Sequence, residues 1–311
     1  MVWDGVGGNR LDWAGVPRAV RAAIEAAMGS AVVEAVSQRG GFSPGLAARL
    51  RLADGRRVFA KAVGAERNPQ SVRMHRREAE IAGGLPAGVA VPRLLWSGAA
   101  DWAVLVFEDV AGHTPPLPWR PKDWHRVHDA LVALARDLTS SPVDAGPIGQ
   151  DPDAFRGWRS LAADPALAAA LDPWSRRNVD RLAALEAGWA AAAAGDTLLH
   201  GDLRADNILL TDDRVLFVDW PQAAVGAAWV DLVCMLPSVA LQGGPDPDDV
   251  WRTSPVAAGA DPAAVDAVLA AVTGFFVHSA LLPSPPGLPT LRRFQHLQAG
   301  PALAWLRSRL R

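Results

Sequence analysis

With 311 residues, half of them hydrophobic and 21% charged, the chain can bury the core of one large domain or of two lobes around a shared cleft. The net charge of −2 provides no overall positive field, which argues against nucleic acid and against an anionic membrane surface as partners. The single cysteine, Cys234, rules out an internal disulfide framework, and its apolar neighbours predict a small core residue rather than a nucleophile.

Two sequence features bear on where the protein acts. The first residues lack a basic region followed by an apolar stretch, so we expect no signal peptide. The most apolar late segment, residues 267–283, is shorter than the ~20 residues needed to span a bilayer and contains His278, so we expect a buried helix. These features predict a cytoplasmic protein that works without a membrane.

The first part of the chain has the pattern of a small antiparallel sheet with one crossing helix. A helix is expected over residues 12–28, where Val20, Ile24 and Met28 recur at helical spacing. A glycine-rich stretch covers residues 40–45, and Asp54-Gly55 is a tight-turn signal between two strands. The expected strands are residues 31–36, 46–52, 57–63, 92–97 and 103–108, with a helix over residues 68–85 between the third and the fourth.

The character of the sequence changes near residue 110. A proline-rich loop with Pro115, Pro116, Pro118 and Pro121 leads into alanine- and leucine-rich helical segments over residues 123–194. We therefore predict an α+β protein with an N-terminal lobe over residues 1–110 and a larger, mainly helical lobe over residues 111–311.

The strongest motif lies near residue 200 and includes His200, Gly201, Asp202 and Asn207. Asp202 and Asn207 are five positions apart, the spacing of a kinase catalytic loop, and Asp219 ends an apolar strand twelve positions later. Phosphoryl transfer needs a base for the attacking hydroxyl and a magnesium ion, which prefers oxygen ligands. The sequence predicts Asp202 as the base and Asn207 and Asp219 as ligands of Mg²⁺.

These residues, together with Val218-Asp219-Trp220, resemble the aminoglycoside phosphotransferase and choline kinase-like group, which are small-molecule relatives of the protein kinases. The resemblance extends over about residues 30–240 and implies a bilobal protein-kinase-like fold that binds ATP with its N-terminal lobe. It further implies roles for single residues. They are Lys61 at the α- and β-phosphates, Glu78 as the partner of Lys61, Ser43 in the glycine-rich loop, Glu108 to Val110 as the hinge at the adenine, Arg204 at the transferred phosphoryl group and Asp231 as a structural aspartate.

The chain departs from the protein kinases in ways that favour a small acceptor. Asp219 is followed by Trp220 and Pro221, and 11 residues separate Asp219 from Asp231, which leaves little room for an activation segment. The chain also lacks a Gly-Lys-Ser/Thr motif, so a P-loop is excluded. The predicted function is an ATP- and Mg²⁺-dependent phosphotransferase acting on a hydroxyl of a small molecule.

Several alternatives stay open at this stage. The acceptor could be an aminoglycoside or amino sugar, for which the acidic cluster of Asp246, Asp248 and Asp249 would suit a polycation, or the cluster could be a solvated loop. Two other functions stay open. The protein could be a nucleotide-binding regulatory module without turnover, or an enzyme that transfers a nucleotidyl group. The sequence leaves the oligomeric state, the choice between ATP and GTP, and the modified hydroxyl open.

Overall fold

The structure is a computed structural model and describes residues 10–38, 44–99, 101–285 and 288–311. The predicted Ser43 lies outside the described residues. Contacts along the chain divide the described residues into two compact units. We call residues 10–115 and 205–222 the sheet unit, and residues 116–204 and 223–311 the helical unit.

The sheet unit is built on a six-stranded sheet in which the strands follow the order β1-β3-β4-β6-β5, with β2 also paired to β3. The two-residue strand β1 runs parallel to β3, so the sheet is mixed and not purely antiparallel as predicted. A strand this short carries no periodic signal in the sequence. The strands are β1 (Arg10–Leu11), β2 (Val32–Ser37), β3 (Gly45–Leu52), β4 (Arg57–Gly64), β5 (Leu94–Ala99) and β6 (Trp102–Glu108).

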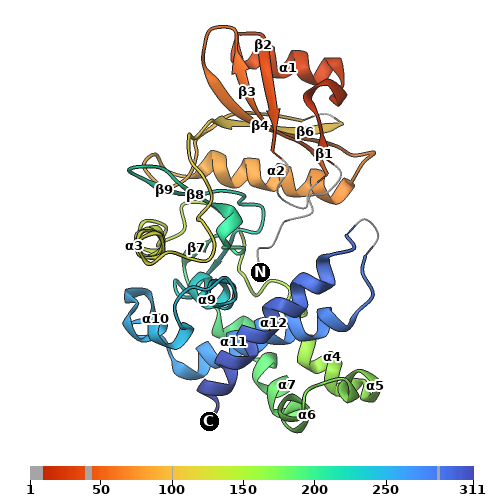
Figure 1. The fold of residues 1–311 in the computed structure, drawn as a ribbon, viewed down its shortest axis with the longest axis vertical. Coiled ribbons are helices and arrows are strands. Elements are labelled where there is room, and N and C mark those ends of the chain that lie inside the picture. The colour runs from red at the N-terminus through yellow and green to blue at the C-terminus, as the bar shows by residue number, and fades with distance from the viewer. Residues whose placement is uncertain (1–9, 39–43, 100, 286–287) are drawn as a thin grey trace. The chain divides into compact units, whose positions relative to one another are not determined.

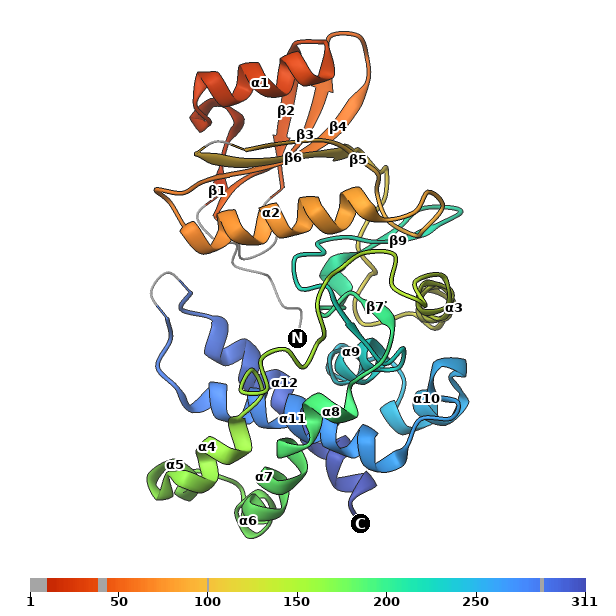
Figure 2. The same ribbon diagram turned by 180° about the vertical axis from the view of Figure 1, so that it is seen from behind.

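The two faces of this sheet carry different helices, α1 (Arg18–Met28) and α2 (Pro69–Gly84), as Figures 1 and 2 show. Successive side chains of a strand point to opposite faces. Accordingly Ala60 of β4 joins the core with Ile24 of α1, whereas Val63 packs with Val72 of α2. A short helix, η1 (Trp13–Gly15), precedes α1, so the predicted helix over residues 12–28 begins later than expected.

The hairpin of β8 (Ile208–Leu210) and β9 (Val215–Phe217) belongs to the sheet unit, although it follows the helical segments in the sequence. His113 and Leu210 exchange backbone hydrogen bonds of 3.0 and 2.8 Å, and the Phe217 N–H donates to the Ala90 carbonyl at 2.8 Å. The structure therefore divides the chain differently from a single cut near residue 110, because these bonds join residues 111–115 and 205–222 to the sheet.

The helical unit surrounds the central helix α11 (Pro262–Leu281), which packs against α4, α7, α8, α9 and α12. By length and composition alone α11 could cross a membrane, but 56% of its apolar window is buried inside the protein, as a core helix would be. The other elements are α3 (Pro121–Asp137), α4 (Gly157–Ala163), α5 (Pro165–Ala169), α6 (Pro173–Arg177), α7 (Val179–Ala187), α8 (Trp189–Ala192), β7 (Thr197–Leu199), β10 (Ala224–Gly226), α9 (Val230–Leu241), α10 (Pro247–Thr253), η3 (Pro255–Ala257) and α12 (Leu291–Arg309).

The apolar helix α11 is longer than predicted from the sequence. The predicted buried segment over residues 267–283 is part of a 20-residue helix, because Asp261 caps its N-terminus by accepting the Ala263 N–H and Pro262 occupies its first position. The buried character of the helix, and not a short length, is what distinguishes it from a membrane span.

Candidate active site

In the sheet unit, Lys61 forms the centre of a buried charge cluster. Its Nζ lies 2.7 and 2.9 Å from the two carboxylate oxygens of Glu78 and 2.8 Å from Oδ1 of Asp219. Lys61 and Glu78 are 15% and 3% exposed, whereas Asp219 is 49% exposed. An ammonium has three N–H donors, so these three contacts use all of them. The predicted pair of Lys61 and Glu78 is thus present, and Asp219 joins it.

The local structure explains why these groups meet. Lys61 lies on the face of β4 that is opposite to Ala60 and Ala62, so it points to the side of the sheet that α2 covers. Asn68 fixes the start of α2, because its side chain accepts the Ser71 N–H at 3.0 Å. Glu78 is one of the buried residues of α2 and reaches Lys61 from there.

The protonation of this cluster follows from burial and charge. Burial alone would lower the pKa of Lys61, but the carboxylates of Asp219 and Glu78 outweigh it and raise the pKa above its ordinary value. His75, buried on α2, has its pKa lowered to about 4 by burial and by the charge of Lys61. Lys61 is therefore a fixed cation at neutral pH, and His75 is neutral.

Asn207 and Asp219 lie at the same end of the β8–β9 hairpin. Ile208 pairs with Phe217, and the Val218 N–H donates to the Asn207 carbonyl oxygen at 2.9 Å. Asp219 follows directly with a φ of 71°, a left-handed conformation that non-glycine residues rarely adopt. The hairpin thus brings together the amide and the carboxylate that the sequence predicts as metal ligands.

The segment after β6, predicted to be the hinge, is held by Arg49 of β3. One guanidinium nitrogen of Arg49 donates to the carbonyl oxygens of Val110 and Gly112 at 3.0 and 3.3 Å. Its Nε lies 3.2 Å from the carboxylate of Asp109, which is 6% exposed and also lies 3.3 Å from Nε of Arg57. Arg49 was not predicted from the sequence, and Asp109 was predicted only as part of the hinge segment, without its ion pairs.

A hollow of about 300 Å³ borders this segment on the sheet unit. Its lining includes Glu108, Asp109, Asp212 and Asp213, together with Arg214. Val110 also lines it. Because this surplus of carboxylates repels phosphate oxygens, we place no phosphate group of a nucleotide in this hollow.

In the helical unit, the backbone of the catalytic-loop motif is anchored by Asp231 in the first turn of α9. The Asp231 carboxylate accepts the N–H groups of His200 at 2.7 Å and of Gly201 at 2.9 Å. Burial raises the pKa of Asp231, although the hydrogen bonds from the two N–H groups oppose this. Gly201 has a φ of 78°, a conformation that glycine adopts without strain. Asp231 is thus a structural residue in this geometry, in agreement with its predicted role.

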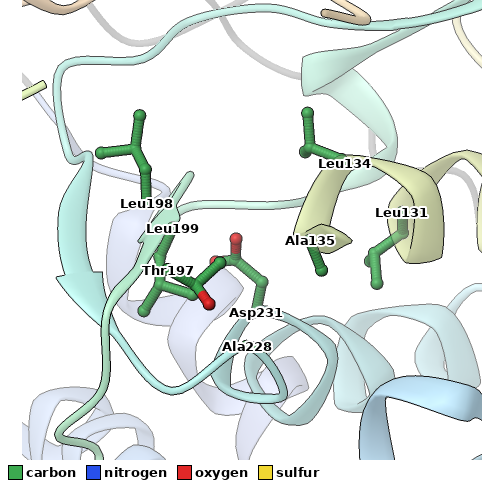
Figure 3. Close-up of a pocket in the computed structure, with 8 residues that line it drawn as sticks. All are labelled: Leu131, Leu134, Ala135, Thr197, Leu198, Leu199, Ala228 and Asp231. Carbon is green, nitrogen blue, oxygen red and sulfur yellow. The ribbon is translucent and has the colours of Figure 1, made fainter. Parts of the chain in front are cut away.

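Figure 3 shows the carboxylate of Asp231 at the wall of a small cavity between β7 and α3. The cavity volume is about 10 Å³, close to the space that one water molecule needs. Its lining is mostly apolar, with Leu131 and Leu134 from α3 and Leu199 from β7. The cavity is too small for a substrate. It is therefore part of the packing around Asp231, the residue that anchors the catalytic loop.

Asp202 and Arg204 form an ion pair within the same loop. Nη1 of Arg204 lies 3.0 Å from Oδ1 of Asp202, and the guanidinium lies over the ring of Phe294 at 5.6 Å from its centroid. The Asp202 N–H donates to Nδ1 of His200 at 3.2 Å, so this ring nitrogen carries no proton in that bond. His200 is completely buried, as expected for a residue that holds the loop.

The predicted site residues are therefore distributed over both units. Lys61, Glu78, Asn207 and Asp219 belong to the sheet unit, as do Glu108 and Val110. Asp202 and Arg204 belong to the helical unit, and the chain passes from one unit to the other between residues 204 and 205. Within the described residues, no group of three His, Cys, Asp or Glu side chains could hold a metal ion by itself.

Residues 41–268 match the model of the phosphotransferase enzyme family. The chain belongs to this family. This match covers well over half of the 311 residues and includes Lys61, Asp202 and Asp219. The chain is thus a small-molecule phosphotransferase, as the sequence predicts. No curated protein matches it in sequence.

Solved structures of this phosphotransferase's relatives share its fold along most of their length. A thermostable mutant of aminoglycoside phosphotransferase APH(4)-Ia with ADP and hygromycin B has a TM-score of 0.60 at 14% identity, and 93% of this chain and 98% of that chain are covered. Spectinomycin phosphotransferase with ADP and spectinomycin has a TM-score of 0.58 at 11% identity, covering 92% and 97%. A choline/ethanolamine kinase family protein from Mesorhizobium loti has a TM-score of 0.58 at 20% identity, covering 94% of each chain. The predicted protein-kinase-like α+β fold is confirmed.

Proposed function

We propose that this phosphotransferase transfers the γ-phosphoryl group of ATP to a hydroxyl group of a small molecule, with Mg²⁺ as the cofactor. The observation that carries the proposal is the buried cluster of Lys61, Glu78 and Asp219, beside a hairpin end that also holds Asn207. A cation fixed between two carboxylates supplies the positive charge that phosphate oxygens require.

The donor set of the hairpin end fits Mg²⁺. Asp219 supplies a half-exposed carboxylate and Asn207 an amide oxygen, and Mg²⁺ commonly takes one or two such protein ligands while phosphates and water complete its shell. When bound, Mg²⁺ would neutralise charge on the phosphate oxygens. Lys61 keeps both of its bonds to Glu78 if phosphate oxygens replace Asp219 at its third donor.

In the catalytic loop, Asp202 is the proposed base that takes the proton of the acceptor hydroxyl. Arg204 already lies 3.0 Å from Asp202, and a guanidinium has five donors, so it can hold Asp202 and contact a phosphoryl oxygen at once. Asp231 fixes the backbone of His200 and Gly201 and thereby the position of the base.

For the acceptor we propose an alcohol of the aminoglycoside or amino sugar class. Support comes from the related structures that contain hygromycin B and spectinomycin. The acidic cluster in α10 lends no support. Asp246 caps α10, Asp248 accepts bonds from Trp305 at 2.6 Å and Ser308 at 2.7 Å, and Asp249 pairs with Arg252, so each carboxylate has a structural partner.

The test is ATP turnover with Mg²⁺ across a panel of aminoglycosides, amino sugars, choline analogues and nucleosides, with Asp202→Asn as the variant. We expect one acceptor class to stimulate release of ADP and the variant to lose this activity while it keeps its thermal stability. Release of pyrophosphate would indicate nucleotidyl transfer instead. ATP binding without turnover on any acceptor would favour the regulatory module, and full turnover by the variant would remove Asp202 from the mechanism.

A further inference from the structure

Val110, in the segment after β6, has a distinctive pattern of hydrogen bonding. Its carbonyl oxygen accepts two hydrogen bonds, from the Gly112 N–H at 2.8 Å and from Arg49 at 3.0 Å. A carbonyl oxygen has two lone pairs, so this oxygen has no capacity left for a ligand. Within the part of the chain that the structure describes, the Val110 N–H has no hydrogen-bond partner. The residue therefore offers a donor but no acceptor.

Arg49 holds this arrangement from the face of the sheet that carries Lys61. Ala47 stands opposite Lys61 in the pairing of β3 with β4, and Arg49 is two residues further along β3, so both side chains project from that face. The Val110 carbonyl is thus saturated by a side chain on the same face as the proposed phosphate anchor.

The orientation of the guanidinium is fixed at its other edge. Asp109 is almost completely buried, and its Oδ1 forms an ion pair with Nε of Arg49 at 3.2 Å, while Arg57 approaches the second oxygen of the same carboxylate. A guanidinium is planar with donors in fixed directions, so the ion pair with Asp109 also orients the nitrogen that donates to Val110.

Adenine and guanine differ in what they require from such a segment. Adenine presents the acceptor N1 beside a 6-amino donor, so N1 can take the Val110 N–H while the amino group faces the carbonyl of Glu108. Guanine presents the acceptor O6 beside the donor N1–H. If guanine took the pose of adenine, its N1–H donor would face the Val110 N–H, and its O6 acceptor would face the carbonyl oxygen of Glu108. In a shifted pose, O6 would take the Val110 N–H, but N1–H would then face the saturated Val110 carbonyl.

We propose that Arg49 makes this phosphotransferase select adenine over guanine nucleotides by occupying the Val110 carbonyl. Arg49 is a positioning residue that acts through the backbone of Val110, and the inference rests on the proposed function. A buried donor without an acceptor is costly, and the loss of one such bond corresponds to about a tenfold change in affinity.

The experiment is calorimetric titration of the full chain with ADP and with GDP in the presence of Mg²⁺, which needs no acceptor. We expect the wild-type chain to bind ADP at least about tenfold more tightly than GDP. Arg49→Met frees the Val110 carbonyl and should reduce the ADP-to-GDP affinity ratio about tenfold. The matched control is Arg51→Met, because Arg51 lies on the same strand and pairs with exposed Glu34, and its ratio should equal that of the wild type.

We compare the ratio of the ADP and GDP affinities because, if Arg49 had only a structural role, its replacement would weaken the binding of both nucleotides equally. A ratio that Arg49→Met leaves unchanged, or a wild-type chain that prefers GDP, would overturn this inference while the proposed function stands. Binding of neither nucleotide by the wild type would overturn both. If Arg49→Met does not fold, Arg49→Leu provides the same test, since leucine also has no donor for the Val110 carbonyl.

Discussion

The anchoring of the catalytic loop by Asp231 leads to a prediction whose size can be worked from the structure. In Asp231→Ala, the N–H groups of His200 and Gly201 lose their acceptor. The His200 N–H is fully buried and would cost about 1–3 kcal/mol when unsatisfied. Gly201 is exposed, so water can replace the carboxylate and the loss there is about 0.5–1.5 kcal/mol.

A part of this cost is recovered because the variant no longer buries a carboxylate, whose raised pKa shows that burial disfavours its charge. We expect a net loss of about 2–3 kcal/mol in the free energy of unfolding for Asp231→Ala. Asp231→Asn should lose about 1 kcal/mol, because its amide oxygen can still accept one of the two N–H groups.

Urea denaturation of both variants gives the stability loss, and steady-state turnover gives its effect on the loop. Because Asp231 positions the backbone that carries Asp202, kcat should fall more than tenfold while KM for ATP changes little. Asp180→Ala is the control, since Asp180 is an exposed aspartate in the first turn of α7. A loss below about 0.5 kcal/mol for Asp231→Ala, or an unchanged kcat, would refute the anchoring role.

Other predictions concern single contacts. Lys61→Met leaves buried Glu78 without its cation, so we expect a loss of about 3–5 kcal/mol in unfolding free energy and loss of ADP binding by calorimetry; unchanged ADP affinity would contradict the phosphate role. Asp172→Ala removes the N-cap of α6 and should cost about 1 kcal/mol in thermal or urea denaturation. Burial acts to raise the pKa of Asp172, but hydrogen bonds, including the one from Ser175, lower this pKa below its unfolded value. The stabilisation by Asp172 is therefore present above about pH 3.9 and is lost as the pH falls through the folded pKa. A difference in stability between wild type and variant that persists at about pH 2 would argue against this. Burial raises the pKa of Cys234 to about 12, so a thiol reagent at pH 8 should label it at least about a hundredfold more slowly than in urea, and equal rates would disprove its protected state.

The contacts predicted from the sequence rest on the family resemblance and on fixed motif spacing. Lys61 and Glu78 could be paired in advance because they resemble the strand lysine and the helix glutamate of the family. Asn207 and Asp219 could be joined because Asp219 ends an apolar strand twelve positions after Asn207, and the structure shows this strand as one half of a hairpin. Such regularities are local, and the sequence displays them directly.

The missed contacts depend on tertiary pairing that no local pattern encodes. Arg49 and Val110 are 61 positions apart, and an arginine in a strand usually lies at the solvent face, so nothing in the sequence indicates a bond to a carbonyl. The acidic cluster of Asp246, Asp248 and Asp249 shows the same limit. The sequence left open whether it binds a polycation or is a solvated loop, whereas the structure gives its carboxylates partners in α10 and α12.

The left-handed backbone of Asp219 has a consequence for how this enzyme can be improved. It is the only non-glycine with a positive φ among the described residues, and such a conformation costs about 1–2 kcal/mol for any residue with a Cβ atom. Glycine would relieve that cost and would leave Lys61 with both of its bonds to Glu78. Laboratory selection for heat resistance alone would therefore favour glycine at this position and discard the carboxylate proposed to hold Mg²⁺, so any such selection has to be coupled to a screen for turnover.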